Sequence, residues 1–224
     1  MNDTGGRQAL VVGATGLVGR SLLTRLTQHD SYEMIATLGR RAPDFRHERV
    51  SHHVVDFSGD WNLSAISRVD VLFCCLGTTI KQAGSQAAFR AIDFDLVVAI
   101  ARQAFKSGTG TFVVVSSVGA RADAGSFYPR TKGEMEQAVS SLGFKRLGIL
   151  RPSLLLGARQ DLRIAEQLGQ HAARLFKPLM VGGLNRYRAV DARTVADSMI
   201  GFDLSDAAGV CIIEGKEIRR LAQS

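Results

Sequence analysis

The amino-acid sequence predicts an α/β protein: a Rossmann-type, doubly wound and mostly parallel sheet with a small C-terminal lobe. Three observations predict this class. Short apolar runs rich in branched residues recur without strict polar alternation, as in strands that are covered on both faces. Helical patterns lie between these runs, which is typical of parallel strands joined by crossovers. A glycine-rich turn, VVGATGLVGR at 11–20, joins the first run to the first helical pattern.

The expected strands are the apolar runs themselves. Their shortness and their content of β-branched residues favour strands over buried helices. They cover residues 9–12, 33–38, 51–57, 69–76, 111–117, 146–152 and 210–215.

The expected helices show apolar residues at helical spacing. The first, 16–28, places three leucines on one face, and the stretches 86–108 and 131–143 each close on a glycine. Two further helical pieces, 161–176 and 191–202, lie in the tail of the chain. Since no repeat or linker stands out, residues 1–224 are expected to form one domain, with about 157–190 contributing the small lobe on the substrate side.

Composition narrows the class of protein. No stretch approaches the roughly 18 apolar residues of a membrane span, and the polar N-terminus lacks the apolar core of a signal peptide. The three cysteines show no disulfide framework, which fits a reducing compartment. We therefore expect a cytoplasmic protein with no membrane partner.

The formal net charge of +7 fits either nucleic acid or an anionic cofactor. The basic residues are scattered and form no nucleic-acid-binding module, so a nucleic-acid partner is not expected. The histidines His47, His52 and His53 lie close together, but no cysteine or carboxylate stands at metal-ligand spacing from them. No metal site is expected either.

The glycine-rich turn has the spacing that a pyrophosphate site requires. Such a turn must be tight, its backbone must approach the phosphates, and its helix must pack close to its strand. The N-terminus of the helix then offers N–H groups and a positive dipole to the anion. Gly19 completes the Gly-x-x-Gly-x-x-Gly pattern. The residues expected to bind the cofactor here are Gly13, Thr15, Gly16, Leu17 and Val18.

With this glycine spacing, the sequence resembles the short-chain dehydrogenase/reductase superfamily in its extended or atypical branch. Nearly the whole chain takes part in the resemblance. The supporting motifs are FCCLGTT at 73–79, VVVSSVGA at 113–120, YPRTK at 128–132 and LRPSLLLG at 150–157. More closely, the combination of GRR, VDF, CCLGTT, SSVGA and RPSLLLG resembles the human Tat-interacting protein family of NADPH-binding oxidoreductase-like proteins and its bacterial relatives.

The resemblance implies further cofactor contacts. Asp56 and Phe57 would flank the adenine, although Phe57 could equally be a core residue. Arg151 could equally be structural, and Ser153 would lie near the carboxamide. The residues that the resemblance adds to the cofactor site are Asp56, Phe57, Leu76, Gly77, Thr78, Arg151 and Ser153.

The end of the second strand indicates which dinucleotide is bound. A carboxylate there would accept from the ribose 2′-hydroxyl of NAD. The sequence instead has Arg40 and Arg41 about twenty residues after the glycine turn, and no carboxylate at that position. Guanidinium groups suit a 2′-phosphate, so NADP(H) is the expected cofactor, unless the arginines merely face solvent.

Tyr128 and Lys132 are the expected catalytic pair. At a spacing of four residues they share one face of a helix, and Pro129 is tolerated in its first turn. A phenol with an ordinary pKa near 10 is a poor acid or base at neutral pH, and a nearby ammonium favours the phenolate. The pair could therefore perform general acid–base catalysis, with Lys132 also binding the nicotinamide ribose and both residues contacting the cofactor.

The serine that would orient the substrate lies at the end of the fifth strand. Ser117 corresponds best to the catalytic serine of the resembled superfamily, and Ser116 is the alternative. Adjacent residues of a strand point to opposite faces, so only one of the two can face the site.

The sequence thus predicts an NADP(H)-dependent oxidoreductase acting on a small carbonyl or alcohol. Two alternatives stay open: a regulatory or redox-sensing NADP(H)-binding protein, and an enzyme of the sugar-nucleotide epimerase or dehydratase type, which usually has a larger tail. Arg186 and Arg188 could meet an anionic substrate, and helices 86–108 and 131–143 could pair in a homodimer. The substrate, the direction of reaction and the oligomeric state do not follow from the sequence.

Overall fold

The computed structural model describes residues 6–59, 61–63, 66, 68–153, 155–156 and 189–223. Its centre is a seven-stranded sheet in the order β3-β2-β1-β4-β5-β6-β9, and every neighbouring pair of strands is parallel. The strands are β1 (Arg7–Val12), β2 (Tyr32–Gly39), β3 (Val50–Val54), β4 (Val71–Cys74), β5 (Thr111–Val115), β6 (Arg146–Arg151) and β9 (Gly209–Glu214). The order reverses between β1 and β4, which is where doubly wound sheets bind ligands.

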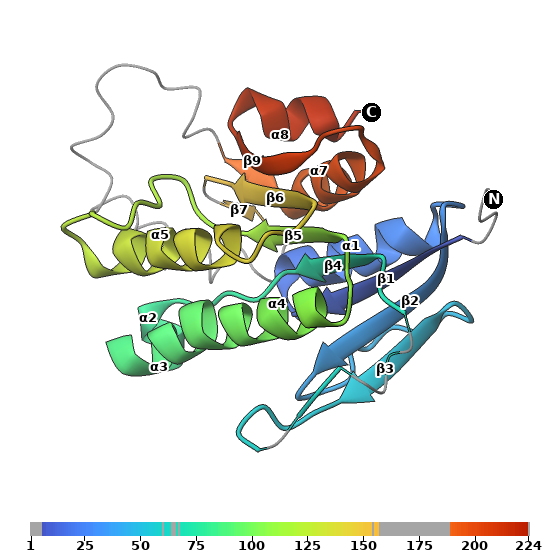
Figure 1. The fold of residues 1–224 in the computed structure, drawn as a ribbon, viewed down its shortest axis with the longest axis horizontal. Coiled ribbons are helices and arrows are strands. Elements are labelled where there is room, and N and C mark those ends of the chain that lie inside the picture. Colours follow the sequence, from blue (N-terminus) through green and yellow to red (C-terminus); the bar gives the residue numbers. More distant parts are fainter. Residues whose placement is uncertain are drawn as a thin grey trace.

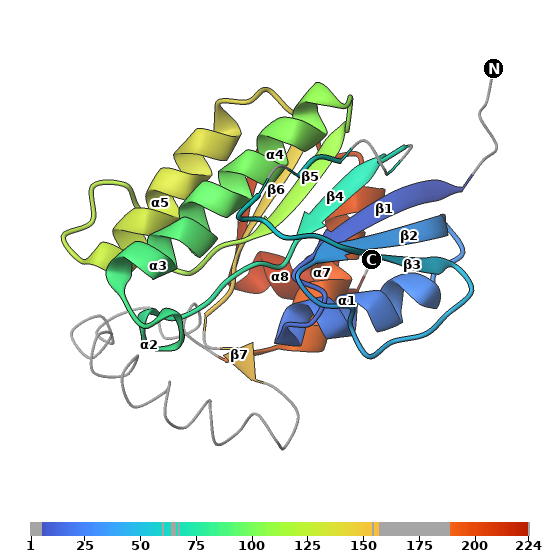
Figure 2. The same ribbon diagram turned by 90° about the horizontal axis from the view of Figure 1, so that it is seen from below.

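Helices cover both faces of this sheet (Figure 1). On one face, apolar side chains of α1 (Leu17–Thr27), α7 (Ala192–Leu204) and α8 (Lys216–Leu221) form one core cluster with the strands. On the other face, α4 (Val97–Lys106) and α5 (Phe127–Ser140) form a second cluster and lie side by side (Figure 2). The Rossmann-type, doubly wound α/β fold is confirmed, and the central strands β4 and β5 are buried along their whole length, as the unbroken apolar runs predicted.

Each predicted strand is present, with ends that differ by a few residues. The run 69–76 is shorter as a strand, because the chain leaves the sheet after Cys74. The expected helix 86–108 contains a different geometry at its middle: α3 (Gln86–Arg90) and α4 are joined by η1 (Ala91–Leu96), a π-helical segment.

The second half of the chain departs further from the prediction. Helix α5 begins at Phe127, four residues before the stretch 131–143, so that both Tyr128 and Lys132 are helical, as predicted for a pair that shares one helix face. Four further elements were not predicted: the helices α2 (Ile80–Ala83) and α8, and the small parallel pair of strands β7 (Leu155–Leu156) and β8 (Val190–Asp191). The predicted helix 161–176, most of the lobe 157–190, and the arginines Arg186 and Arg188 lie outside the described residues.

A buried carboxylate ties α7 to the start of the sheet. Asp203 accepts hydrogen bonds from Tyr32 at 2.7 Å and from two nitrogens of Arg7 at 2.9 and 2.6 Å. Burial raises the pKa of Asp203, although Arg7 and Tyr32 oppose the rise. Arg146 donates to four carbonyl oxygens at and beyond the C-terminal end of α7. These contacts fix α7 against β1, β2 and β6.

The packing of α7 on β6 also depends on the absence of a side chain at Gly148. A Cβ atom there would lie 2.7 Å from the ring of Phe202, which is buried in α7. The same Cβ added at Gly110 would have no heavy atom within 4 Å.

We predict that Gly148→Ala lowers the free energy of unfolding by about 1–3 kcal/mol, because the buried ring and the helix behind it must shift. The matched control Gly110→Ala shares the change in unfolded-chain entropy but not the clash. Urea unfolding of both variants measures the difference. Equal unfolding free energies for the two variants would contradict the proposed clash.

Candidate functional site

The carboxyl ends of the central strands bring the predicted site residues to one edge of the sheet. The glycine turn follows β1, the segment 75–79 follows β4, Ser116 and Ser117 follow β5, and Arg151 ends β6. The amide of Cys75 donates to the carbonyl of Val12 at 2.8 Å, so the turn and the segment after β4 leave the sheet together.

The glycine turn has a tightly packed backbone with no side chains at its glycine positions, which would let an anion approach closely. Gly13 has a φ of 82°, and a Cβ atom there would lie 2.6 Å from the carbonyl carbon of Cys75. A Cβ on Gly19 would collide with the carbonyl oxygen of Gly13. Gly16 is the N-cap residue of α1 and has no side chain that could accept a hydrogen bond from the first turn of the helix. The first N–H groups of α1 therefore open toward this turn, as a pyrophosphate requires, and the residues present fit a dinucleotide.

Arg40 and Arg41 lie exposed in the turn after β2. The amide of Val55 donates to the carbonyl of Gly39 at 3.0 Å, which places the turn beside the segment after β3. There, hydrogen bonds from the backbone and side chain of Ser58 lower the pKa of Asp56, and the charge of Arg40 contributes. Two arginines and a solvent-exposed carboxylate thus stand at the end of the sheet where the adenosine half of a dinucleotide would lie.

Phe57 is half-buried next to this group. Its ring meets the ring of Trp61 edge-on at 5.1 Å and packs on the core cluster of α4 and α5. Both the core role and the adenine-flanking role remain compatible with this position.

Tyr128 and Lys132 lie one turn apart on α5, as predicted. The ring of Tyr128 is 5.2 Å from that of Phe89, a fully buried residue of α3. Lys132 is only 3% exposed, and its Nζ lies 2.6 Å from Oδ1 of Asp93, a fully buried residue of η1. The pair is therefore contacted by Phe89 of α3 and Asp93 of η1, two consecutive helical elements.

The segment after β4 lies against the same carboxylate. The amide of Thr78 donates to Oδ2 of Asp93 at 2.9 Å. A Cβ added at Gly77 would stand 3.7 Å from Oδ1 of Asp93 and 3.9 Å from Nζ of Lys132, so the backbone of Gly77 lies close to the ion pair. Leu76 and Thr78 are half-buried on either side of it.

The two adjacent serines have different environments. Ser116 is buried and donates to Oε1 of Glu136 at 2.5 Å, on the face that α5 covers. Ser117 is half-buried and its hydroxyl lies 3.4 Å from the carbonyl of Val118. The hydroxyl of Ser116 is thus engaged in a buried hydrogen bond, whereas Ser117 is the more exposed of the two serines.

Arg151 lies in the same buried network as Ser116. Its guanidinium donates to both oxygens of Glu136, at 3.0 and 2.6 Å, and approaches Glu214 at 3.8 Å. The hydrogen bonds to Glu136 raise the pKa of Arg151 despite its partial burial. The structure thus places Arg151 in a structural role, between α5 and β9, and leaves Ser153 half-buried beyond it.

Three residues of the site were missed from the sequence: Asp93, Phe89 and Glu136. Asp93 had a detectable signal. It falls on the apolar stripe that runs through Phe89, Val97 and Ile100, all of them fully buried. A buried carboxylate requires a cation or hydrogen-bond donors as partners, so a carboxylate on a buried stripe indicates a polar site inside the fold.

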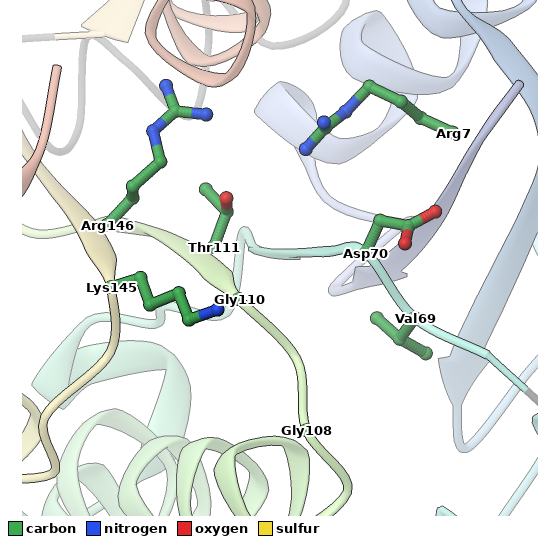
Figure 3. A pocket seen from close by; sticks show the side chains of 8 residues that line it. All are labelled: Arg7, Val69, Asp70, Gly108, Gly110, Thr111, Lys145 and Arg146. Carbon is green, nitrogen blue, oxygen red and sulfur yellow. The ribbon is translucent and has the colours of Figure 1, made fainter. Parts of the chain in front are cut away.

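Other parts of the described chain offer less chemistry. A cavity of about 310 Å³ lies at the opposite, amino-terminal edge of the sheet (Figure 3), but the arginines at its wall are the ones engaged with α7 and Asp203. Burial raises the pKa of the Cys74 thiol to about 11, and burial also raises that of Cys75. Among the described residues, no group of three or more histidines, cysteines, aspartates or glutamates could hold a metal ion.

Comparison with known proteins identifies the family. The family profile described as HIM1 matches residues 59–181, and one described as the NAD-binding domain of semialdehyde dehydrogenase matches residues 8–93. Protein HTATIP2 of Rattus norvegicus is 34% identical, over 97% of this chain and 90% of that protein. The protein fmp52 of Aspergillus niger is 35% identical, over 92% and 88%. This chain belongs to the HTATIP2/FMP52 family.

Solved structures agree with the fold. MoeE5 in complex with UDP-glucose and NAD superposes with a TM-score of 0.70 at 14% identity, covering 96% of this chain and 80% of that one. A short-chain dehydrogenase family protein from Francisella tularensis has a TM-score of 0.66 at 14% identity, covering 93% and 97%. This chain is thus an NAD(P)-binding Rossmann protein of the HTATIP2/FMP52 family, and its fold is like that of the short-chain dehydrogenase structure, which agrees with the fold that the resemblance predicted.

The expectation of a cytoplasmic protein is wrong. The fungal FMP52 relatives, among them those of Aspergillus niger, Aspergillus terreus and Candida albicans, are named as mitochondrial proteins. Composition and cysteine usage do not distinguish these compartments. Within the described ranges, no helix is both long and apolar enough to cross a membrane.

We predict that Ser116→Ala lowers the free energy of unfolding by about 1.5–3 kcal/mol, because it removes a hydrogen bond to a buried charged group. Ser117→Ala should change it by less than about 0.5 kcal/mol, as is usual away from buried networks. Urea unfolding of both variants checks the assignment. A larger loss from Ser117→Ala would mean that the two serines have been assigned to the wrong faces.

Proposed function

We propose that this protein is an NADP(H)-dependent oxidoreductase that acts on a small carbonyl or alcohol. The observation that carries the proposal is the assembly of two groups on one edge of the sheet. A phosphate cradle and an arginine pair stand at one end of this edge, and Tyr128, Lys132 and Ser117 stand at the other. An acid–base group placed beside a dinucleotide cradle is the arrangement that hydride transfer needs.

The residues at the cradle end would hold the cofactor. The turn from Gly13 to Gly16 and the N-terminus of α1 would receive the pyrophosphate. Arg40 and Arg41 would bind the 2′-phosphate in forked geometry, and the end of β2 carries no carboxylate that would repel it. When bound, the nicotinamide supplies the hydride; the chain supplies the binding, the orientation and the proton.

The residues at the other end would handle the proton. In the reducing direction, Tyr128 donates its phenolic proton to the carbonyl oxygen while the carbonyl carbon accepts hydride, so that an alcohol and a tyrosinate form. The ammonium of Lys132 stabilises that tyrosinate. Phe89 restrains the ring of Tyr128 from behind, and the hydroxyl of Ser117 donates to the same carbonyl oxygen.

The choice of cofactor can be tested with single substitutions. We predict that Arg40→Ala and Arg41→Ala each weaken NADPH binding by about 10- to 100-fold, since each removes a charge-assisted hydrogen bond, and leave the weaker NADH binding within about threefold. Fluorescence titration with each cofactor measures this. The control is Arg46→Ala, an exposed arginine of the same connection. A loss of NADH affinity equal to the loss of NADPH affinity would exclude a 2′-phosphate site.

The catalytic assignment can be tested at Tyr128. We predict that Tyr128→Phe lowers kcat for a reducible carbonyl by about 10²–10⁴-fold, because the proton donor is lost, and changes the Kd of NADPH by less than about tenfold, because only one hydrogen bond to the cofactor is removed. The measurement is NADPH oxidation with a panel of aldehydes and ketones. The enzyme proposal is contradicted if the wild type binds NADPH but reduces no member of the panel, and if Tyr128→Phe retains every biological effect. That result would favour a cofactor-sensing protein.

A further inference from the structure

Asp93 occupies an unusual position in the fold. It is fully buried, and it lies on η1, where the helix widens into π geometry. Such segments are rare and concentrate at functional sites. Both of its oxygens are used: Oδ1 contacts Nζ of Lys132 at 2.6 Å and Oδ2 accepts from the amide of Thr78 at 2.9 Å. One carboxylate therefore connects α5 with the segment after β4.

The groups around Lys132 show that its protonated form is stabilised mainly by the carboxylate of Asp93. The titratable groups that face it are Asp93 from η1, Tyr128 from its own helix and Cys74 from β4. The thiol of Cys74 is neutral at physiological pH, because burial raises its pKa to about 11. Tyr128 carries charge only as the tyrosinate. Among the described residues, Asp93 is thus the carboxylate in contact with the ammonium.

Burial and pairing act on Lys132 in opposite directions. Burial lowers the pKa of Lys132, but Asp93, together with Tyr128 and Cys74, outweighs it, so the net pKa is raised. A buried lysine without such a partner titrates well below its ordinary range. The raised pKa means that the ion pair stabilises the fold fully below the ordinary lysine pKa, and that this contribution is lost as the pH rises through the folded value.

We propose that Asp93 is a positioning residue of the catalytic pair: it keeps Lys132 as an ammonium beside Tyr128 and fixes that ammonium to the segment 76–78, which would border the cofactor. The proposal rests on the function proposed above for Tyr128 and Lys132. It adds a residue that touches neither substrate nor cofactor and acts through the lysine. It also explains why a carboxylate is buried on the apolar stripe of this helix.

Two substitutions separate the two contacts of Asp93. Asp93→Asn removes the charge but keeps an oxygen that can accept from the amide of Thr78. Asp93→Ala removes both. The control is Asp95→Asn, the same chemical change at an exposed position of the same π segment. Circular dichroism first establishes that each variant is folded.

The direct readout is the titration of Lys132 by NMR in protein labelled at the lysine ε-carbon, with the signal assigned through bonds from the backbone. In the wild type we expect Lys132 to titrate no lower than the ordinary value of 10.5. In Asp93→Asn it should titrate more than about one pH unit lower, and in Asp95→Asn it should not move. This measurement needs neither cofactor nor turnover, so it remains decisive if no carbonyl substrate is found.

The functional readouts then distinguish positioning from simple stabilisation. The kcat/KM of Asp93→Asn should gain a limb that falls as the pH rises through the lowered lysine pKa, whereas a merely structural loss would reduce kcat/KM equally at every pH. Asp93→Ala should weaken NADPH binding more than Asp93→Asn does, because only the alanine variant releases Thr78. The proposal is overturned if Asp93→Asn leaves the titration of Lys132 unchanged.

Discussion

The buried ion pair between Lys132 and Asp93 is the contact on which the site depends. An ammonium that is 3% exposed and a carboxylate that is fully buried can coexist only at close range. Their contact requires η1 and α5 to pack at a defined separation and in a defined register. The same carboxylate also receives the backbone of the segment after β4. Three elements that are separate in sequence are thereby fixed together at the end of the sheet that carries Tyr128 and Lys132.

The cradle end is constrained differently, by close contact between backbone atoms. Gly13 lies so near the carbonyl of Cys75 that no side chain fits between β1 and the segment after β4. That segment is therefore held by the glycine turn on one side and by Asp93 on the other. It runs from the glycine turn to the Tyr128–Lys132 pair and so connects the two halves of the candidate site. This geometry suits a single extended ligand that spans both ends.

Sequence patterns predicted the parts of this architecture that are local. Apolar runs located each strand of the main sheet, and residue spacing identified the glycine turn and the Tyr128–Lys132 pair. The features that the sequence did not predict depend on contacts between residues that are distant in the chain. Only the fold shows that Ser116 meets Glu136 and that Arg151 joins the same network. Helical periodicity also cannot distinguish an α-helix from a π segment of six residues, so η1 was missed and, with it, the partner of Lys132.

The central claim is that both ends of this edge serve one NADP(H) molecule. A crystal structure of the protein with NADP⁺ tests it most directly. The account predicts the pyrophosphate over the turn from Gly13 to Val18, the 2′-phosphate on Arg40 and Arg41, and the nicotinamide ribose within hydrogen-bonding distance of Tyr128 and Lys132, with the Lys132–Asp93 contact intact. A dinucleotide bound with its 2′-phosphate away from both arginines, or with its nicotinamide remote from Tyr128, would contradict it.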